Sequence, residues 1–194
     1  MTAALRDAQR AIACNVFRRV SPESPTLCEG WSAYDLATHL WTLDHDPLAW
    51  PAIGIGALSS WERKRFDRIQ QRLPYPALID QLAAGRGSFA CMPTDRFEDY
   101  RHSLGEWFVH TEDVRRANGI SKPDYPDDLQ VAFWLRLQAA AKALFPLRCI
   151  RFVTTSGATG RTGRGTIETT VTGEPAELLL WAYGRRDAAD VELS

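Results

Sequence analysis

The sequence predicts a mainly helical protein: a four-helix bundle followed by a small α+β extension made of a β-hairpin and a helix. Much of residues 1–122 repeats apolar side chains at spacings of three and four, the period of a helix with one buried face. After Pro126 the pattern changes, and two short runs alternate apolar with polar residues, as strands do. We therefore expect a helical domain at 1–122 and an α+β domain at 123–194.

The first predicted helix covers residues 2–19. Its apolar stripe consists of Leu5, Ala8, Ile12 and Val16. Pro22 and Pro25 follow, and neither can continue the hydrogen-bond ladder of a helix.

The second helix has the clearest start. Ser32 and Asp35 match the capping box, in which a serine hydroxyl and an acidic side chain three residues later satisfy free backbone N–H groups. His39 lies among leucines at helical spacing, so we expect it on the inward face of this helix.

Two more helices complete the predicted bundle. Residues 59–72 are rich in charge and should be half solvated, and Pro76 opens a further turn after them. Residues 98–118 form the fourth helix, which stops at Gly119. Helices of this length with short connections predict an antiparallel bundle.

The extension begins with a helix at residues 127–145. Strands at 149–155 and 166–172 follow, joined as a hairpin whose tip is the glycine-rich segment 156–165. A last helix runs from Pro175 through Tyr183.

Charge and hydropathy exclude several classes of protein. The formal net charge is -1, whereas a nucleic-acid-binding protein normally carries a basic excess. The apolar run 178–183 is far shorter than the ~20 residues that span a bilayer. Arg6 and Asp7 stand where a signal peptide would be apolar. We expect a cytoplasmic protein that binds neither nucleic acid nor membrane.

The cysteines are scattered, and no C-x-x-C pair occurs. In a cytosolic chain such cysteines predict buried or idle thiols and neither a disulfide frame nor a zinc knuckle. They are Cys14, Cys28, Cys91 and Cys149.

One group of residues has the pattern of a metal site. Glu106 and His110 are four apart on one helix, which places both side chains on one face. His39 points inward from another helix, and three such ligands leave a position open for chemistry. His102 stands one turn before Glu106 and competes as a ligand. The alternative is that these histidines only make hydrogen bonds.

Asp113 is one turn beyond His110 and has two readings. It either fixes the His110 imidazole or pairs with Arg116 on the surface, and the surface pairing is favoured.

Three segments resemble a known family. Residues 28–40 (CEGWSAYDLATHL) resemble the N-terminal signature of the mycothiol-dependent maleylpyruvate isomerase family, part of the DinB/YfiT-like metalloprotein superfamily. Residues 105–117 (GEWFVHTEDVRRA) resemble its second signature, and 172–185 (TGEPAELLLWAYGR) its C-terminal helix. The resemblance implies a DinB-like bundle that binds a divalent metal through His39, Glu106 and His110.

The resemblance also implies a chemistry. Zinc is the favoured metal, and nickel, iron and manganese suit the same ligands. Mycothiol is the implied cosubstrate, and its metal-bound thiolate would attack a small electrophile in a transferase or isomerase reaction. Arg185 is the nearest match to a catalytic arginine of the family, with Arg186 beside it; both also suit a helix end. The short C-terminal part indicates a compact actinobacterial subgroup of metal-binding proteins.

Alternative functions stay open at this point. They are a non-catalytic metal- or thiol-binding protein, a metal-dependent hydrolase, and a metal-free helical module. The sequence also leaves open whether two chains pair as a homodimer.

Overall fold

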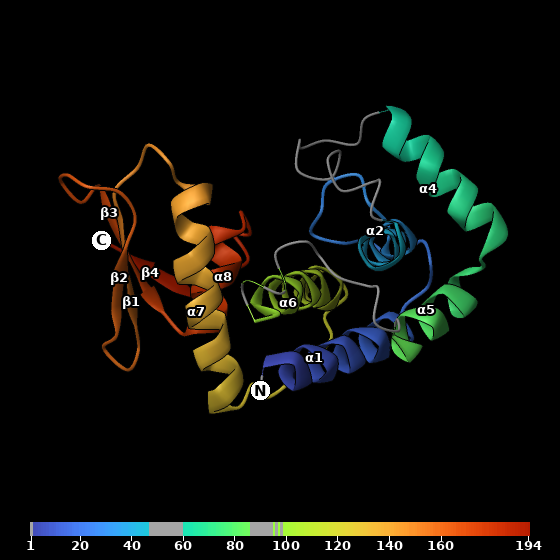
Figure 1. Ribbon diagram of the computed structural model, residues 1–194, viewed down its shortest axis with the longest axis horizontal. Helices are drawn as coiled ribbons and strands as arrows, with labels where there is room; N and C mark the ends of the chain where they lie inside the picture. Colours follow the sequence, from blue (N-terminus) through green and yellow to red (C-terminus); the bar gives the residue numbers. More distant parts are fainter. Residues whose placement is uncertain (1, 47–59, 86–94, 96, 98) are drawn as a thin grey trace. The chain divides into compact units, whose positions relative to one another are not determined.

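The computed structural model describes residues 2–46, 60–85, 95, 97 and 99–194 (Figure 1). The chain divides into two compact units, Met1–Lys122 and Pro123–Ser194. The first is helical, and the second combines helices with a small sheet, so the predicted mainly helical class with a small C-terminal α+β part is confirmed. That the two units are separate domains stays a prediction.

The described part of the first unit is built from helices that pack around α1 and α2. α1 lies along α6 and α5, as Figure 1 shows, and α2 contacts α5, α4 and α6. The helices are α1 (Thr2–Phe17), α2 (Ala33–His45), α4 (Ser60–Arg72), α5 (Tyr75–Ala84) and α6 (Arg101–Ala117).

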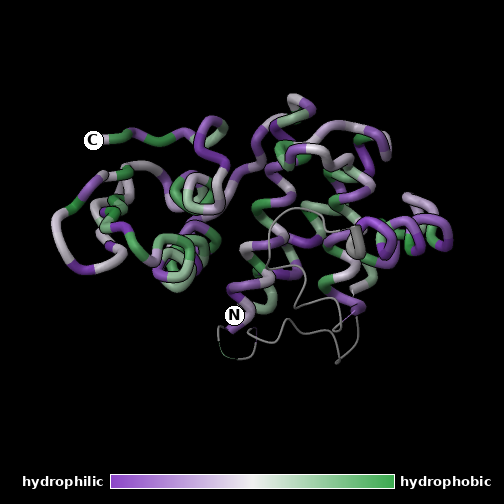
Figure 2. The backbone as a smooth tube through the Cα atoms, turned by 90° about the horizontal axis from the view of Figure 1, so that it is seen from above, coloured by the Kyte–Doolittle hydropathy of each residue, from purple (hydrophilic) through white to green (hydrophobic). Residues whose placement is uncertain are grey.

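The core of this unit joins α1, α2, α5 and α6. α5, predicted only as a further turn, is a full helix that contributes Leu78, Ile79 and Leu82 to the core. α4 is mostly hydrophilic, as its colour in Figure 2 shows. Phe66 is buried among its described side chains. The half-solvated character expected of residues 59–72 is therefore observed over the described part of that stretch.

The buried face of α1 differs from the predicted stripe. Of the predicted stripe, Val16 is buried, Leu5 and Ile12 are partly buried and Ala8 is exposed. The helix also buries Gln9, Ala13, Cys14 and Phe17. Apolar spacing located the helix correctly but placed its inward face part of a turn away, because the polar Gln9 is buried on α6, where its Nε2 donates to Thr111 Oγ1 at 3.3 Å.

α2 begins as predicted. The Asp35 N–H donates to Ser32 Oγ at 3.2 Å, and the Ser32 N–H donates to Asp35 Oδ2 at 3.0 Å, which completes the capping box. Asp35 also accepts from Arg63 Nη1 of α4 at 2.8 Å. The cap thereby ties the start of α2 to its neighbour.

α6 starts later than predicted. Asp99 and Tyr100 have φ of 49° and 62°, in the left-handed region, so the helix begins at Arg101 instead of at residue 98. It ends as predicted, with Gly119 at φ 61°. Inside it, Glu112 is fully buried and accepts both Arg115 Nε at 2.6 Å and Arg116 Nε at 2.7 Å.

The second unit packs two helices against a sheet. α7 (Asp127–Leu144) contacts α8 (Pro175–Ala182), and α8 also contacts β1, β3 and β4. Every α8 residue from Ala176 to Ala182 is buried, as expected for a helix covered on several sides. The sheet has the order β2-β1-β3-β4, with β1 (Ile150–Thr154), β2 (Thr159–Arg161), β3 (Thr169–Gly173) and β4 (Val191–Leu193).

The predicted hairpin between 149–155 and 166–172 is wrong. β1 and β3 pair in parallel, and the antiparallel partner of β1 is β2, which lies inside the segment expected to be the hairpin tip. The chain turns earlier because Gly157, at φ 87°, allows its N–H to reach the Thr154 carbonyl at 2.8 Å. Strand-like alternation does not encode which strands pair.

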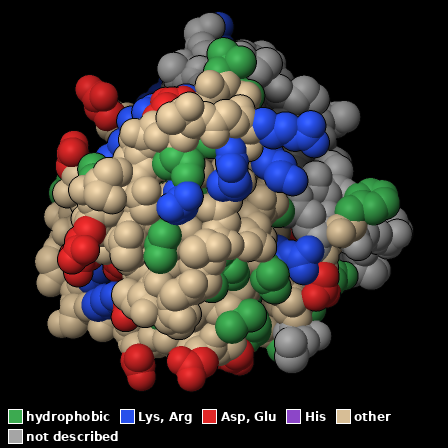
Figure 3. Space-filling view, turned by 90° about the vertical axis from the view of Figure 1, so that its left-hand side faces the viewer, with side chains coloured by type: hydrophobic (Ala, Val, Ile, Leu, Met, Phe, Trp, Pro, Cys, Tyr) green, Lys and Arg blue, Asp and Glu red, His purple; other side chains and the backbone are tan. Residues whose placement is uncertain are grey.

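The described surface carries charged side chains of both signs (Figure 3). On the face shown in Figure 3, basic side chains gather in the upper part and acidic ones lie along the left and lower edges. Among the residues described, no helix combines the length and apolar character needed to cross a membrane.

The buried ion pair within α6 predicts a large loss of stability. Glu112→Ala would leave Arg115, which is 7% exposed, without its counter-charge, so we expect the free energy of unfolding to fall by about 3–5 kcal/mol. Asp80→Ala removes the exposed ion pair with Arg18 and should cost less than about 1 kcal/mol. Denaturant unfolding measures both, and equal losses would contradict the prediction.

The Cys14 thiol predicts a pH dependence. Burial raises its pKa from 9.0 to about 11, because a thiolate in the core would lose its hydration. The folded-state pKa is the higher one, so this contribution to stability is complete below pH 9.0 and is lost as the pH rises through about 11. We expect unfolding free energies at pH 8–11 to fall more steeply for the wild type than for Cys14→Ala, by about 2 kcal/mol over this range. If the unfolding free energies of both proteins fall equally with pH, the prediction is wrong.

Candidate metal centre

α2 and α6 bring together the three residues that the sequence proposed as metal ligands. One ligand atom each of His39, Glu106 and His110 lies within 4.8 Å of the others. The two histidines are 5% and 8% exposed. Their rings meet edge to face, with centroids 5.1 Å apart. The juxtaposition expected from helical spacing is therefore present, while ligation itself stays a proposal.

Glu106 is shared between two histidines of its own helix. Its Oε2 lies 3.5 Å from His110 Nε2, and its Oε1 lies 3.6 Å from His102 Nε2. His102 therefore contacts the opposite carboxylate oxygen. Among the described residues, the group of converging ligand atoms around Glu106 includes His39 and His110 but not His102.

Asp113 orients His110, which corrects the favoured surface reading of this carboxylate. Its side chain is 0% exposed, and the Oδ2 atom accepts from His110 Nδ1 at 2.9 Å. A ring that donates through Nδ1 keeps its Nε2 lone pair for a ligand, and this Nε2 is the nitrogen that faces Glu106. Arg116 pairs with Glu112 instead.

The charges of this cluster favour a bound cation. Burial would raise the pKa of the Glu106 carboxyl, but hydrogen bonds from His102 and His110 outweigh it and hold the pKa well below its usual range. For His110, burial would lower the pKa, but hydrogen bonds to Asp113, Cys28 and Glu106 outweigh it and raise the pKa well above its usual range. The two carboxylates thus stabilise positive charge between them, carried either by a proton or by a metal.

Trp31 closes one side of the cluster. Its ring meets His39 edge to face at 5.3 Å between centroids, and it meets Phe66 of α4 in the same way at 5.6 Å. An aromatic wall excludes water and strengthens the electrostatic interactions beside it.

The sequence did not predict a role for Cys28 at this site. It was expected to be buried or idle like the other cysteines, but it is only partly buried and its Sγ donates to Asp113 Oδ2 at 3.2 Å. With His110 and Asp113 it forms a second group of converging ligand atoms. Cys14 and Cys149 are buried, and Cys91 lies outside the described residues. The available signal was the position of Cys28 at the start of the first signature.

The donor set fits a divalent metal. Ligands held 2.0–2.1 Å from a tetrahedral zinc ion lie about 3.4 Å apart, and the 3.5 Å between Glu106 Oε2 and His110 Nε2 already matches that spacing. Two imidazoles and one carboxylate also suit ferrous iron, nickel or manganese. His39, Glu106 and His110 would hold the ion, with a further position open.

The predicted catalytic arginine belongs to the second unit. Arg185 follows α8 and donates from Nη1 to the Tyr183 carbonyl at 2.6 Å. The Arg186 guanidinium lies 5.1 Å from the centroid of the Trp181 ring. The Arg185 contact fits the helix-end role considered for these arginines, and the Arg186 contact is a cation–π interaction. A catalytic role for Arg185 stays a prediction.

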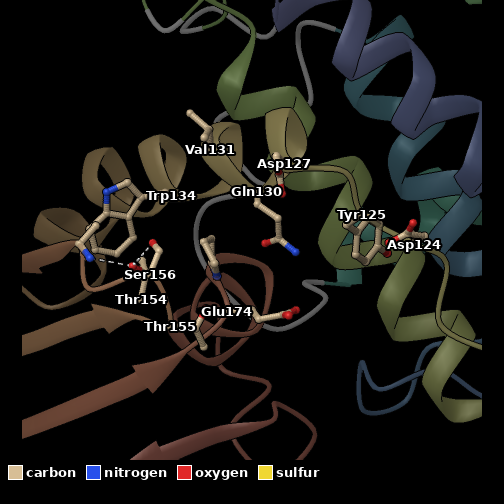
Figure 4. A pocket seen from close by; sticks show the side chains of 12 residues that line it. Asp124, Tyr125, Asp127, Gln130, Val131, Trp134, Thr154, Thr155, Ser156 and Glu174 are labelled. Carbon is tan, nitrogen blue, oxygen red and sulfur yellow. Dashed lines mark hydrogen bonds between the residues drawn. The ribbon is translucent and has the colours of Figure 1, made fainter.

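The second unit also contains a cavity that no predicted site residue lines (Figure 4). Its volume is about 620 Å³. Gln130 and Trp134 line it from α7, opposite Thr154, Ser156 and Glu174. Some of these polar groups serve the fold itself: Gln130 Oε1 accepts from the Ala176 N–H at 3.1 Å, and Thr154 Oγ1 accepts from the Ala158 N–H at 2.9 Å.

The contact between His110 and Asp113 predicts an effect on metal affinity. Asp113→Ala removes the acceptor that fixes the His110 ring, so we expect zinc affinity to fall about 10–100-fold. Competition with a chromophoric chelator measures the dissociation constant, and circular dichroism checks folding. Asp80→Ala, on the surface, should bind zinc like the wild type. Unchanged affinity in Asp113→Ala would rule out the orienting role.

Comparison with known proteins identifies the fold. The sequence matches no family model and no curated protein. Among solved structures, the crystal structure of the mycothiol-dependent maleylpyruvate isomerase is similar, with a TM-score of 0.64 at 16% identity over 98% of this chain and 90% of the enzyme. A histidine-to-alanine variant of the isomerase gives a TM-score of 0.63 at 17% identity, with the same coverage. The chain therefore has the fold of the mycothiol-dependent maleylpyruvate isomerase, as the resemblance of its signatures led us to expect.

Proposed function

We propose that the protein is a metal-dependent enzyme that joins a small thiol to a small electrophilic substrate, as a transferase or isomerase. The observation that carries the proposal is the convergence of His39, Glu106 and His110 on a common point. Support for mycothiol as the thiol comes from the fold shared with the mycothiol-dependent maleylpyruvate isomerase and from the signatures around His39 and His110. We further propose that the protein acts in the cytoplasm, where thiols stay reduced.

Each residue of the cluster has a definite task in this proposal. His39 and His110 supply neutral nitrogen ligands, and Glu106 supplies one negative charge, so the bound site keeps a net positive charge. A divalent cation held there supplies the charge that favours the deprotonated form of a thiol or of water. Asp113 holds the His110 ring in the tautomer that leaves Nε2 toward the site.

The surroundings favour an anionic reactant. Trp31 packs against His39 and against Phe66, and this apolar side excludes water, which would strengthen the attraction between a thiolate and the bound cation. We also propose a catalytic role for Arg185, whose planar donor fork suits a carboxylate. This assignment rests on the resemblance of residues 172–185 to the C-terminal helix of the family.

Two other functions use the same residues. A metal-dependent hydrolase would need the cation but no thiol, and a non-catalytic binding protein would hold metal or thiol without turnover. We favour the thiol-dependent enzyme because the fold of this chain matches that of a mycothiol-dependent isomerase over nearly its whole length.

Metal content and turnover test the proposal together. We expect about one equivalent of divalent metal in the purified wild type by elemental analysis, and conjugation of a model electrophile with mycothiol. His39→Ala and chelation should each reduce turnover at least about 100-fold, because the cation supplies several kcal/mol of charge stabilisation.

His45→Ala is the matched control on the same helix. The His45 ring stacks on Trp41, and its Nδ1 lies 3.0 Å from the Trp41 carbonyl oxygen, so metal content and turnover should persist in this variant. Metal without turnover would indicate the binding protein, turnover without mycothiol the hydrolase, and absence of metal a purely helical module.

A further inference from the structure

The segment between α1 and α2 is anchored on the helix that carries the metal centre. The Leu27 N–H donates to the Asp113 carbonyl at 3.1 Å, and Asn118 Nδ2 donates to the Pro25 carbonyl at 2.9 Å. Residues 25–31, here called the positioning loop, are therefore attached to α6 at Asp113, in the turn that follows His110, and at Asn118, the C-cap of the helix.

The positioning loop is ordered by its own hydrogen bonds. Thr26 Oγ1 accepts from the Cys28 N–H at 3.1 Å and lies 2.9 Å from the Trp31 carbonyl, to which it donates. The Trp31 N–H donates to the Cys28 carbonyl at 3.0 Å, across Gly30 at φ 76°. Any residue other than glycine would be strained in that conformation. The tight turn that Gly30 permits holds Cys28 and Trp31 in place.

Cys28 and Trp31 of the positioning loop reach the metal centre, and each constrains one of its histidines. Cys28 Sγ donates at 3.2 Å to Asp113 Oδ2, the same oxygen that accepts His110 Nδ1 at 2.9 Å. Trp31 packs against His39. Because Asp113 is fully buried, a donor at this oxygen restricts where the carboxylate, and hence the His110 ring, can lie.

We propose that Cys28 is a positioning residue, which holds the His110 ring both through Asp113 and by its own contact with that ring, and thereby acts on metal affinity. The inference rests on the metal site of the proposed function. The other reading, in which Cys28 is itself a ligand together with His110 and Asp113, would need the His110 Nδ1 atom. That nitrogen already donates to Asp113, whereas Nε2 faces Glu106, so the hydrogen-bonded chain accounts for the observed distances.

Cobalt binding to a set of variants tests the chain of contacts. We expect Cys28→Ala to weaken Co²⁺ affinity about tenfold, the lower end of the range for residues that orient ligands. Cys28→Ser keeps a donor and should restore affinity to within about threefold of the wild type. In an Asp113→Ala background, Cys28→Ala should have a smaller effect than in the wild type, because the route through Asp113 is already removed. Cys149→Ala, a buried thiol of the second unit, is the control.

Two readouts keep the proposal separate from the proposed function. A near-ultraviolet thiolate-to-cobalt band that disappears in Cys28→Ala would show direct ligation and overturn the positioning role, as would unchanged affinity in that variant. If the wild type binds no Co²⁺, the proposed function fails. The Nδ1 proton resonance of His110 in the metal-free protein then decides on Cys28: a shift in Cys28→Ala but not in Cys149→Ala supports the positioning role, and identical spectra refute it.

Discussion

The hydrogen bond between the buried carboxylate of Asp113 and His110 Nδ1 is the interaction on which the candidate site depends. It selects the nitrogen that faces the centre, because an imidazole that donates on one side offers its lone pair on the other. An ionised carboxylate without water is costly unless it is paired, and Asp113 meets that condition with donors from His110 and Cys28. The orientation of the ring and the stability of the buried charge are thus two aspects of one contact.

α6 carries an unusual amount of buried charge, and the fold accommodates it in two separate groups. Glu112 is neutralised by Arg115 and Arg116, three and four residues further along the helix. Glu106, His110 and Asp113 instead face α2 and the positioning loop. Because α6 supplies most of the polar groups, α2 needs to contribute only His39, and its capping box and apolar packing set the position of that histidine.

The second unit has a different construction, since its order comes from apolar packing. α8 is buried along its length between α7 and the strands. In the same core Trp181 stacks on Phe145 and meets Phe152 edge to face. Trp181 of this core also lies under the Arg186 guanidinium, and Arg185 donates to the Tyr183 carbonyl at the end of α8. The cavity near Trp134 is lined by side chains that also serve the turn of β1 and β2 and the start of α8, which links its shape to that local packing.

The sequence by itself determined most of the helices, the capping box of α2 and the placement of Glu106 and His110 on one helix face. Such features depend on interactions within a few residues, so the spacing of Glu106 and His110 and the capping box of Ser32 predicted them directly. Only the tertiary structure decided the parallel pairing of β1 with β3, the burial of Gln9 and the contact of Cys28 with Asp113. Each of these depends on residues far apart in the chain, and local periodicity carries no information about which distant surface a residue will meet.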